Sequence, residues 1–596
     1  MVREFSYFSG IQIKENNNLS YKERQARLIY RAVIMILLST TVIGIQVSRL
    51  AQLQLIQGKH NRARAENNRI RPIPVPSNRG LILDRNGKPF ASNRLQHSIY
   101  LWPREQVREQ WEITAAKLSP IINMPAHKIL EKVEEALISG ERNVHLSYQV
   151  SRNTFTLLQE KAEEFPGVEA RAESTRYYPH GETASHVIGY LGEVTSAELG
   201  ANPEYQLRMM VGRIGVEASR NEQLAGKWGQ RMIEVNAENR EIGIFKEEEP
   251  QSGETIKLTL DLNLQKAAEN ALGSRKGAVV VLDVNTGEVL TMASYPRFNP
   301  NVFTKPMAES EWRSLHSQEQ SFVNRTIQGY PPGSTFKVVT SAAAMGSQKF
   351  APGSIIQTSD AVYIGGMSFN EHSGGYGPIG FRAALAYSSN TFFYRIGMAI
   401  GNKEIAKWAY KLGLGGKNIN LLGIPVTYNG LIPTEEDKRQ IYNDRWYLGD
   451  TVTMAIGQGL VLATPLELAG AVAAIANGGK QVKPHLLADQ TNYPEIQPIP
   501  TGLKPEEVNI IKEGMIDVVY RGTAKNLNDG SIPLTGGKTG TSELIGQRSH
   551  SLYVAFGPAN KPEIAIAVIV ENGGYGSRSA APVAKQVFQY YFGNNN

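Results

Sequence analysis

A serine and a lysine three residues apart form the strongest chemical signal in the sequence. Ser334 follows a Pro-Pro-Gly turn, and Lys337 stands in an apolar run, residues 336–345, that is typical of a buried helix. Residues i and i+3 of a helix share one face, so we expect the Lys337 amine to reach the Ser334 hydroxyl at the start of that helix. A partly desolvated lysine can accept a serine proton, and a helix N-terminus favours developing negative charge. The pair therefore predicts nucleophilic acyl transfer.

The pair alone is a weak signal, because a helix-capping serine followed by a solvated lysine is common. Two further segments strengthen the prediction. Residues 388–390 read Ser-Ser-Asn, and residues 538–541 read Lys-Thr-Gly-Thr. Ser-x-x-Lys, Ser-x-Asn and Lys-Thr-Gly in this order are the signature of penicillin-binding proteins and serine β-lactamases. The sequence thus resembles this family, and we expect the three segments to converge on one cleft around the Ser334 hydroxyl.

The resemblance gives each polar residue of the first two segments an expected role. Ser334 would be the nucleophile and Lys337 its base, with a Lys337 pKa lowered by burial and by nearby Lys538. Ser388 would relay the proton toward the leaving amine. Asn390 would hold both the peptide backbone of the substrate and the Lys337 ammonium.

The third segment is expected to be a strand, residues 535–542, beside the nucleophile. Gly540 would let the substrate approach the backbone closely. Backbone N–H groups of the nucleophile and of Thr541 would form the oxyanion hole. Lys538 and the hydroxyls of Thr539 and Thr541 would bind a substrate carboxylate.

The similarity extends over about residues 79–590. Residues 79–91, 176–190 and 212–217 resemble motifs of the amino-terminal domain of class B penicillin-binding proteins, and residues 324–326 and 449–469 match the catalytic domain. Within class B, the elongation-specific branch, that of penicillin-binding protein 2, is most similar, and the division-specific branch is second.

The family implies a serine-type peptidoglycan D,D-transpeptidase of cell elongation and shape. Ser334 would attack the D-Ala-D-Ala bond of a stem pentapeptide, release D-Ala, and pass the acyl group to an amine of a neighbouring stem. β-Lactams would acylate the same serine. The implied partner is a membrane-embedded glycan polymerase of the shape, elongation, division and sporulation (SEDS) family, contacted through the membrane helix and the pedestal.

One membrane-spanning helix is predicted at residues 28–48, after a polar tail at residues 1–27. Residues between Arg31 and Arg49 carry no charge and span roughly 26 Å as a helix, which nearly crosses the hydrocarbon core. A buried soluble helix and a cleaved signal peptide are the alternatives. Positive charges on both sides only weakly favour a cytoplasmic N-terminus. The resemblance places the rest outside the bacterial inner (plasma) membrane, in a periplasmic position.

Two domains are expected after the helix, a pedestal at residues 49–253 and a transpeptidase domain at residues 254–596. Asn86-Gly87 predicts a tight turn, and residues 105–170 carry two or three amphipathic helices. The expected fold class is α+β, with helices packed on an antiparallel sheet built from both ends of the second domain. Its expected strands are residues 256–261, 278–284, 289–295, 551–556 and 564–570, and its flanking helices are residues 262–272 and 580–591.

Composition excludes several other classes of protein. The 596 residues contain no cysteine, so disulfides, thiol catalysis and zinc–thiolate sites are excluded. The formal net charge is +7, without a long basic run interleaved with aromatic residues, so nucleic-acid binding has no support.

No cofactor and no metal are predicted. Some relatives of the elongation group hold a metal near the second motif, with a cysteine of that motif as one ligand. Here Ser389 takes the middle position, and Asp360 with His372 upstream would make a poor zinc site. His372 is instead expected as an ordinary loop residue or a structural contact.

Three other functions share parts of this pattern. A serine β-lactamase needs a deacylation water and no pedestal, whereas about 200 residues precede the catalytic domain here. A bifunctional enzyme would add an acidic glycosyltransferase motif before residue 250, and none is found. A β-lactam-binding sensor or scaffold would carry further signalling segments.

Overall fold

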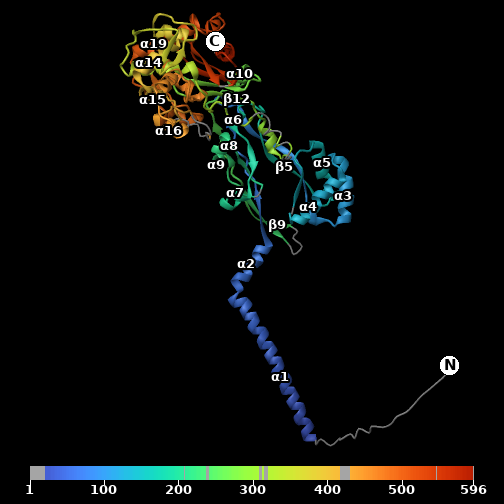
Figure 1. Ribbon diagram of the computed structural model, residues 1–596. Coiled ribbons are helices and arrows are strands. Elements are labelled where there is room, and N and C mark those ends of the chain that lie inside the picture. Colours follow the sequence, from blue (N-terminus) through green and yellow to red (C-terminus); the bar gives the residue numbers. More distant parts are fainter. Residues whose placement is uncertain are drawn as a thin grey trace, which may run out of the picture. The chain divides into compact units, whose positions relative to one another are not determined.

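The computed structural model describes residues 21–594, except 142, 207, 236–240, 306, 308, 309, 311, 314–319, 417–423, 425–429 and 545. Most of the predicted N-terminal tail therefore lies outside the described residues. The chain divides into two compact units (Figure 1). The first unit is Met1–Val75 with Trp228–Glu249, and the second is Pro76–Lys227 with Pro250–Asn596.

The first unit contains the predicted membrane helix. Helix α1 (Tyr21–Ala51) passes through a π-helical turn, η1 (Gln52–Ile56), and α2 (Gly58–Arg69) follows. Residues 23–56 are the one stretch in the described part of the chain that is long and apolar enough to cross a membrane, and their apolar side chains are exposed. The unit also holds an antiparallel sheet in the order β1-β8-β9. Its strands are β1 (Ile70–Val75), β8 (Gly229–Val235) and β9 (Glu241–Glu248).

The amino-terminal part of the second unit is a small sheet covered by helices. Its strands are β2 (Ile82–Leu83), β3 (Pro89–Leu101), β4 (Val144–Ser147), β5 (Val168–Tyr177) and β10 (Ile256–Lys257). The helices predicted within residues 105–170 are confirmed as α3 (Arg108–Ile122), α4 (Ala126–Ser139) and α5 (Arg152–Glu160). The predicted tight turn is also confirmed, since Gly87 has a φ of 86° and its N–H donates to the Asp84 carbonyl oxygen.

Short elements complete this part of the unit. They are α6 (Ser185–Ile188), β6 (Leu191–Glu193), α7 (Ser196–Ala201), β7 (Met210–Gly212), α8 (Gly215–Ser219) and α9 (Asn221–Ala225). The strand predicted at residues 256–261 is shorter than expected, because β10 ends at Lys257. Asp261 instead caps the next helix, and its carboxylate accepts hydrogen bonds from the N–H groups of Asn263 and Leu264.

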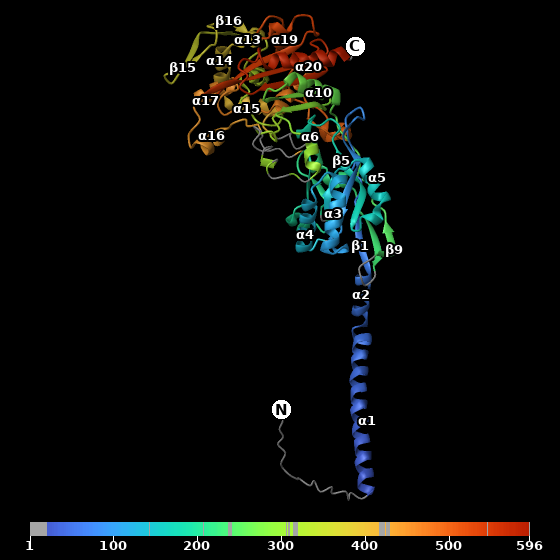
Figure 2. The same ribbon diagram turned by 90° about the vertical axis from the view of Figure 1, so that its right-hand side faces the viewer.

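The catalytic-domain sheet is antiparallel in the order β12-β11-β21-β20-β19, so strands from both ends of the domain meet in one sheet as predicted. The strands are β11 (Gly277–Asp283), β12 (Val289–Tyr295), β19 (Gly536–Leu544), β20 (Gln547–Gly557) and β21 (Ile564–Val570). The predicted helices are confirmed as α10 (Leu262–Leu272) and α20 (Ala580–Asn594), which pack side by side (Figure 2).

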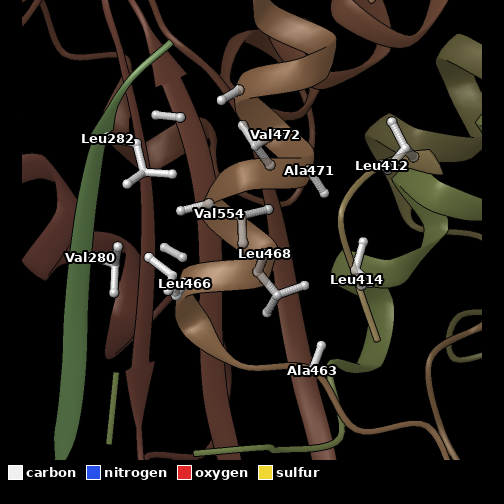
Figure 3. Packing of buried hydrophobic residues seen from close by; sticks show 14 of the residues in the cluster. Val280, Leu282, Leu412, Leu414, Ala463, Leu466, Leu468, Ala471, Val472 and Val554 are labelled. Carbon is white, nitrogen blue, oxygen red and sulfur yellow. The ribbon is translucent and has the colours of Figure 1, made fainter. Parts of the chain in front are cut away.

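Alternating apolar residues of β11 serve two cores. Val279 and Val281 join the cluster that contains residues of α10 and α20. Val280 and Leu282 point to the other face, where they belong to the same cluster as residues of the buried helix α18 (Pro465–Ala476), as Figure 3 shows. The continuous apolar run of this strand, residues 278–282, is thus explained by helices on both faces of the sheet.

Helices and short hairpins fill the region between the two ends of the sheet. The helices, with one 3₁₀ turn, are η5 (Gly333–Phe336), α12 (Lys337–Gly346), α13 (Phe381–Tyr387), α14 (Asn390–Ile400), α15 (Asn402–Lys411), α16 (Glu435–Tyr442), α17 (Leu448–Ala455) and α19 (Pro505–Tyr520). The strand pairs are β13 (Ile355–Gln357) with β16 (Pro378–Gly380), β14 (Ala361–Ile364) with β15 (Met367–Asn370), and β17 (Lys480–Gln481) with β18 (Ile499–Pro500). Helix α12 is buried from Lys337 to Met345, so it forms the centre of this region.

A buried ion pair ties together the segments that resemble class B motifs. The Glu217 carboxylate accepts hydrogen bonds from Arg79 Nε at 2.6 Å and from Arg176 Nε at 2.7 Å, and its side chain has no exposed surface. Burial opposes the ionisation of Glu217, but the charges of Arg176 and Arg79 outweigh it and hold the Glu217 pKa below its ordinary value.

We therefore expect Glu217→Gln to lower the free energy of unfolding by about 3–5 kcal/mol, because two buried guanidinium groups lose their counter-charge. Glu134→Gln is the matched surface control. It removes the exposed pair with Arg108, and we expect a change of at most about 1 kcal/mol. Since the Glu217 pKa is depressed in the folded state, its contribution is present above the ordinary carboxyl pKa and disappears as pH falls through the folded value. Urea denaturation at neutral and acidic pH measures both effects, and equal losses in the two variants would contradict this account.

Candidate active site

Ser334 lies in a tight turn rather than at the first residue of an α-helix. The 3₁₀ turn η5 carries Ser334, and α12 begins only at Lys337. Gly333 has a φ of 54°, and a Cβ atom placed there would lie 2.6 Å from the Thr541 carbonyl oxygen. This close approach to β19 requires glycine and presses the turn against the strand. The Ser334 hydroxyl is partly exposed and forms no hydrogen bond with any residue that the structure describes.

The Lys337 amine points to the second segment and not to Ser334. Lys337 Nζ donates to the Ser388 carbonyl oxygen at 2.7 Å, to Asn390 Oδ1 at 2.7 Å and, more weakly, to Ser388 Oγ at 3.3 Å. The three donors of an ammonium are thereby used, which explains why the hydrogen bond expected between Lys337 and Ser334 is absent among the described contacts. Burial lowers the Lys337 pKa to about 7, against an opposing effect of the Glu371 charge.

Lys538 is the second fully buried lysine of the site. Its Nζ donates to Ser388 Oγ at 2.8 Å and to the Thr539 carbonyl oxygen at 3.0 Å. Burial lowers the Lys538 pKa well below its ordinary value, and the charge of Lys337 lowers it further. The sequence predicted that burial and nearby Lys538 would both lower the Lys337 pKa. Burial has this effect on Lys337, and the repulsion between the two amines lowers the Lys538 pKa.

The third segment forms β19 and lies directly against the turn of Ser334. A Cβ atom at Gly540 would come within 2.8 Å of Thr335 Cγ2 and 3.0 Å of the Pro332 carbonyl oxygen, so Gly540 allows the strand and the turn to pack. The Thr539 hydroxyl shares a hydrogen bond of 2.7 Å with the Thr523 hydroxyl. Thr541, which is partly exposed, accepts a hydrogen bond from Gln458 Nε2 on its carbonyl oxygen at 3.2 Å.

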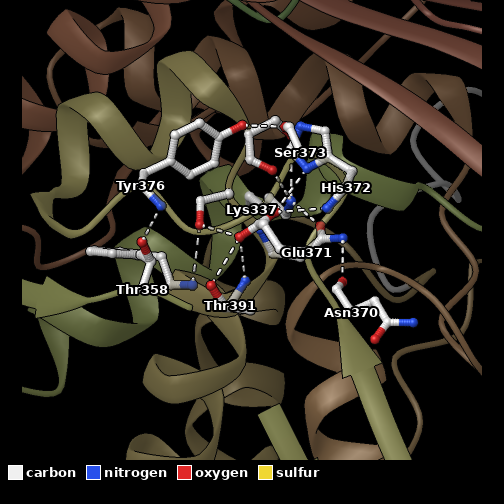
Figure 4. Close-up of polar contacts among 12 residues, drawn as sticks. Lys337, Thr358, Asn370, Glu371, His372, Ser373, Tyr376 and Thr391 are labelled. Atoms are coloured by element: carbon white, nitrogen blue, oxygen red, sulfur yellow. Dashed lines mark hydrogen bonds and ion pairs between the residues drawn. The ribbon is translucent and has the colours of Figure 1, made fainter. Parts of the chain in front are cut away.

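Glu371 is a residue of this region that sequence reasoning missed. It follows β15 directly, and Figure 4 shows its carboxylate at the centre of a polar cluster. The carboxylate accepts hydrogen bonds from the Ser389 hydroxyl, the Asn390 N–H and both the N–H and the hydroxyl of Thr391, at 2.6–2.9 Å. The sequence signal was weak, since Glu371 stands in an irregular segment far from the second motif.

His372 and Asp360, the two residues of the poor candidate zinc site, have other contacts. His372 Nδ1 lies 2.8 Å from Glu371 Oε1, and the Asp360 carbonyl oxygen accepts a hydrogen bond from the Glu371 N–H at 2.7 Å. Ser389, at the position of the metal-binding cysteine, donates to Glu371. In the described part of the chain, no three His, Asp or Glu side chains are grouped closely enough to hold a metal ion.

A second, partly buried carboxylate fixes the approach to the nucleophile turn. Glu571 Oε1 accepts hydrogen bonds from Arg325 Nε and from the Tyr330 hydroxyl, both at 2.8 Å. The Arg325 side chain is 1% exposed and that of Glu571 is 16% exposed. Tyr330 directly precedes the Pro-Pro-Gly turn, and the chain entering the Ser334 turn is therefore anchored to the end of β21.

Two family models match this chain, one over the catalytic region and one over the region that precedes it. The family described as "Penicillin binding protein transpeptidase domain" matches residues 277–589, and "Penicillin-binding Protein dimerisation domain" matches residues 74–258. A relative from Acinetobacter baumannii named peptidoglycan D,D-transpeptidase MrdA is 32% identical over 95% of this chain and 88% of its own length. The protein of the same name from Escherichia coli K12 is 29% identical over 98% of this chain and 97% of its own length.

Solved structures with the same fold include two from larger assemblies. A chain of a complex between penicillin-binding protein 2 and MreC from Helicobacter pylori has a TM-score of 0.77 and 28% identity, and the match covers 88% of this chain and 99% of that chain. A chain of a structure described as "Structural coordination of polymerization and crosslinking by a peptidoglycan synthase complex" has a TM-score of 0.71 and 31% identity, over 95% and 98% of the two chains.

Proposed function

This chain belongs to the penicillin-binding protein transpeptidase family, and from that premise we propose that it is a peptidoglycan D,D-transpeptidase of cell elongation whose acyl-enzyme forms on Ser334. Enzyme class and fold follow from the family. The observation that carries the assignment to Ser334 is the convergence of three segments. Ser388 Oγ accepts hydrogen bonds from both Lys337 and Lys538, while Gly333 lies against Thr541.

In the first half-reaction the Ser334 hydroxyl attacks the carbonyl carbon between the two D-alanines. Lys337 in its neutral form takes the hydroxyl proton, which a pKa near 7 permits at neutral pH. As the C–N bond breaks, Ser388 passes a proton to the departing D-Ala amine, since its hydroxyl contacts both lysines. N–H groups of Ser334 and Thr541 stabilise the oxyanion, because turn and strand lie in contact.

In the second half-reaction an amine of a neighbouring stem attacks the ester carbonyl, the bond from the carbonyl carbon to Ser334 Oγ breaks, and a proton of the amine returns to Ser334 Oγ. Before the first half-reaction, the terminal carboxylate of the substrate is bound by Lys538 and by the hydroxyls of Thr539 and Thr541. Asn390, whose Oδ1 holds the Lys337 amine, lies where the substrate backbone would pass. β-Lactams acylate Ser334 by the same first step. Because the amide bond that breaks is part of a ring, the amine stays attached to the acyl group and does not depart.

The proposal places the catalytic domain, residues 254–596, and the pedestal, residues 49–253, outside the inner membrane, with residues 1–27 in the cytoplasm. The apolar helix α1 supports membrane anchoring. A SEDS-family glycan polymerase is the proposed partner, supported by the likeness to a chain of a peptidoglycan synthase complex. The likeness to the Helicobacter pylori chain bound to MreC supports a place in an assembly with other proteins.

Labelling with a fluorescent penicillin tests the nucleophile. We expect full-length protein to form a stable covalent adduct and Ser334→Ala to form none, because the other hydroxyl of the turn, that of Thr335, is buried and donates to the Pro332 carbonyl oxygen. Ser341→Ala is the matched control, since it removes a buried hydroxyl of α12 that only donates to the Lys337 carbonyl oxygen. Labelling of Ser334→Ala would overturn the assignment, and rapid loss of the label from the unmodified protein would favour a β-lactamase. Release of D-Ala from lipid-linked substrate would support the transpeptidase.

The pH dependence of acylation tests the base. Because the Lys337 pKa is lowered to about 7, the neutral base is present above that pH and is lost below it. We expect the second-order rate constant for penicillin acylation to fall about tenfold per pH unit below the midpoint and to level off above it. Stopped-flow measurement between pH 5.5 and 9 gives the profile. Lys337→Arg, which stays charged, should abolish acylation throughout, and a flat profile with a folded enzyme would remove Lys337 from the role of base.

A further inference from the structure

A single buried carboxylate organises the second catalytic segment from outside it. We propose that Glu371 is the positioning residue of this segment, which fixes Ser388 and Asn390 opposite Lys337 and sets a fixed negative charge within electrostatic reach of the Lys337 amine. This inference rests on the proposed roles of Ser334 and Lys337. Glu371 itself is expected to touch neither the substrate nor the reacting atoms.

The contacts of Glu371 define the geometry of the segment. One carboxylate oxygen, Oε1, accepts from the Asn390 N–H, and the other, Oε2, accepts from the Ser389 hydroxyl and from the N–H and hydroxyl of Thr391. These donors lie at the start of α14, where N–H groups lack partners within the helix. The carboxylate therefore binds the helix start through four hydrogen bonds, and its side chain is fully buried.

The same helix start holds the catalytic side chains in an uncommon conformation. Ser388 has a φ of 59°, a left-handed conformation that a non-glycine residue rarely adopts. This conformation turns both its carbonyl oxygen and its hydroxyl toward Lys337. Asn390, the residue after the pair of serines, presents Oδ1 to the same amine while its Nδ2 donates to the Asn370 carbonyl oxygen. Without the Glu371 anchor, the described contacts leave the Ser389 hydroxyl only a long hydrogen bond of 3.3 Å that it accepts from the Phe392 N–H, and they leave the Asn390 N–H without a partner.

Charge gives Glu371 a second effect. Burial opposes its ionisation, yet hydrogen bonds from His372, from Ser389 and from the backbone of the helix start lower its pKa to about 2. It therefore stays ionised wherever the enzyme works, and its charge raises the Lys337 pKa against the effect of burial. The other titratable groups facing this pair are Lys538 on β19, His372 beside Glu371, and Tyr394 on α14, whose pKa burial raises to about 12.

Two substitutions at Glu371 separate its geometry from its charge. Glu371→Gln keeps the size but loses the charge and one acceptor, so we expect acylation by penicillin to slow by about 10–100-fold, with the acid-side midpoint moved to lower pH. Glu371→Asp keeps the charge but shortens the reach to the helix start. We expect a comparable loss of rate with the midpoint much less displaced. Rates are measured by stopped flow on the full-length protein in detergent, as for the unmodified enzyme.

Controls assign the effects to Glu371. Glu269→Gln changes another buried carboxylate, which accepts from the Ala184 N–H and from Gln265, and we expect an unchanged rate and midpoint. His372→Asn removes the imidazole that contacts Glu371 Oε1 and should leave the midpoint in place. Thermal denaturation shows which variants are folded. If Glu371→Gln does not fold, Thr391→Val and Ser389→Ala each remove one donor while keeping the charge, and we expect rates several-fold lower with an unmoved midpoint.

The outcomes are distinct. A folded Glu371→Gln with the rate and midpoint of the unmodified protein overturns the proposal, as does a midpoint that moves equally in the Gln and Asp variants or in neither. Unchanged rates in both Thr391→Val and Ser389→Ala overturn it as well. If the unmodified protein takes no label at Ser334, the proposed function fails and this inference fails with it. If the unmodified protein is labelled at Ser334 and the Glu371 variants keep its rate and midpoint, only the positioning role is contradicted.

Discussion

Two buried lysines share one serine hydroxyl, and the rest of the catalytic domain is arranged to make this contact. Lys337 and Lys538 both donate to Ser388 Oγ, and neither amine has exposed surface. Two ammonium ions in a buried site repel each other strongly, so the pair favours a state in which one of them is neutral. A neutral amine that can take the proton of the proposed nucleophile, Ser334, is what acylation of a serine requires. Burial and mutual repulsion of the two amines thus favour the neutral lysine that can act as a base.

The sheet explains how three distant segments of the chain reach that contact. Strand β19 brings Lys538 and is the last strand of a sheet that also contains β11 and β12 from the start of the domain. Helix α12 brings Lys337 and is buried on every side, so its position is set by packing rather than by solvent. The glycines at 333 and 540 allow turn and strand to approach more closely than any side chain would permit. Packing of the η5 turn against β19 therefore fixes the distance between the first and third segments.

Much of the secondary structure was predictable from the sequence, because it depends on local patterns of residues. The apolar runs in residues 278–284 and 289–295, the Asn86-Gly87 turn and the C-terminal helix all follow from local composition, periodicity and turn chemistry, and the structure has each of them. The partners of single polar atoms were not predictable in the same way. A helical spacing of three residues suggested that Lys337 contacts Ser334, but the 3₁₀ turn between them and the acceptors on Ser388 and Asn390 draw the amine elsewhere. Glu371 was missed since its partners lie across a loop in three dimensions and no local pattern joins them.

The charges of the cleft determine which of its two lysines carries a proton. Glu371 is ionised at any pH at which the enzyme works, its charge acts on Lys337, and the charge of Lys337 acts on Lys538. One fixed negative charge beside two amines that repel each other favours a single protonated lysine, and Ser388 contacts both amines. In the proposed mode of binding, a substrate carboxylate would add a second negative charge beside Lys538, which would favour a proton there and leave Lys337 free to act as the base. Binding of the correct substrate would in this way prepare the base before the bond is attacked.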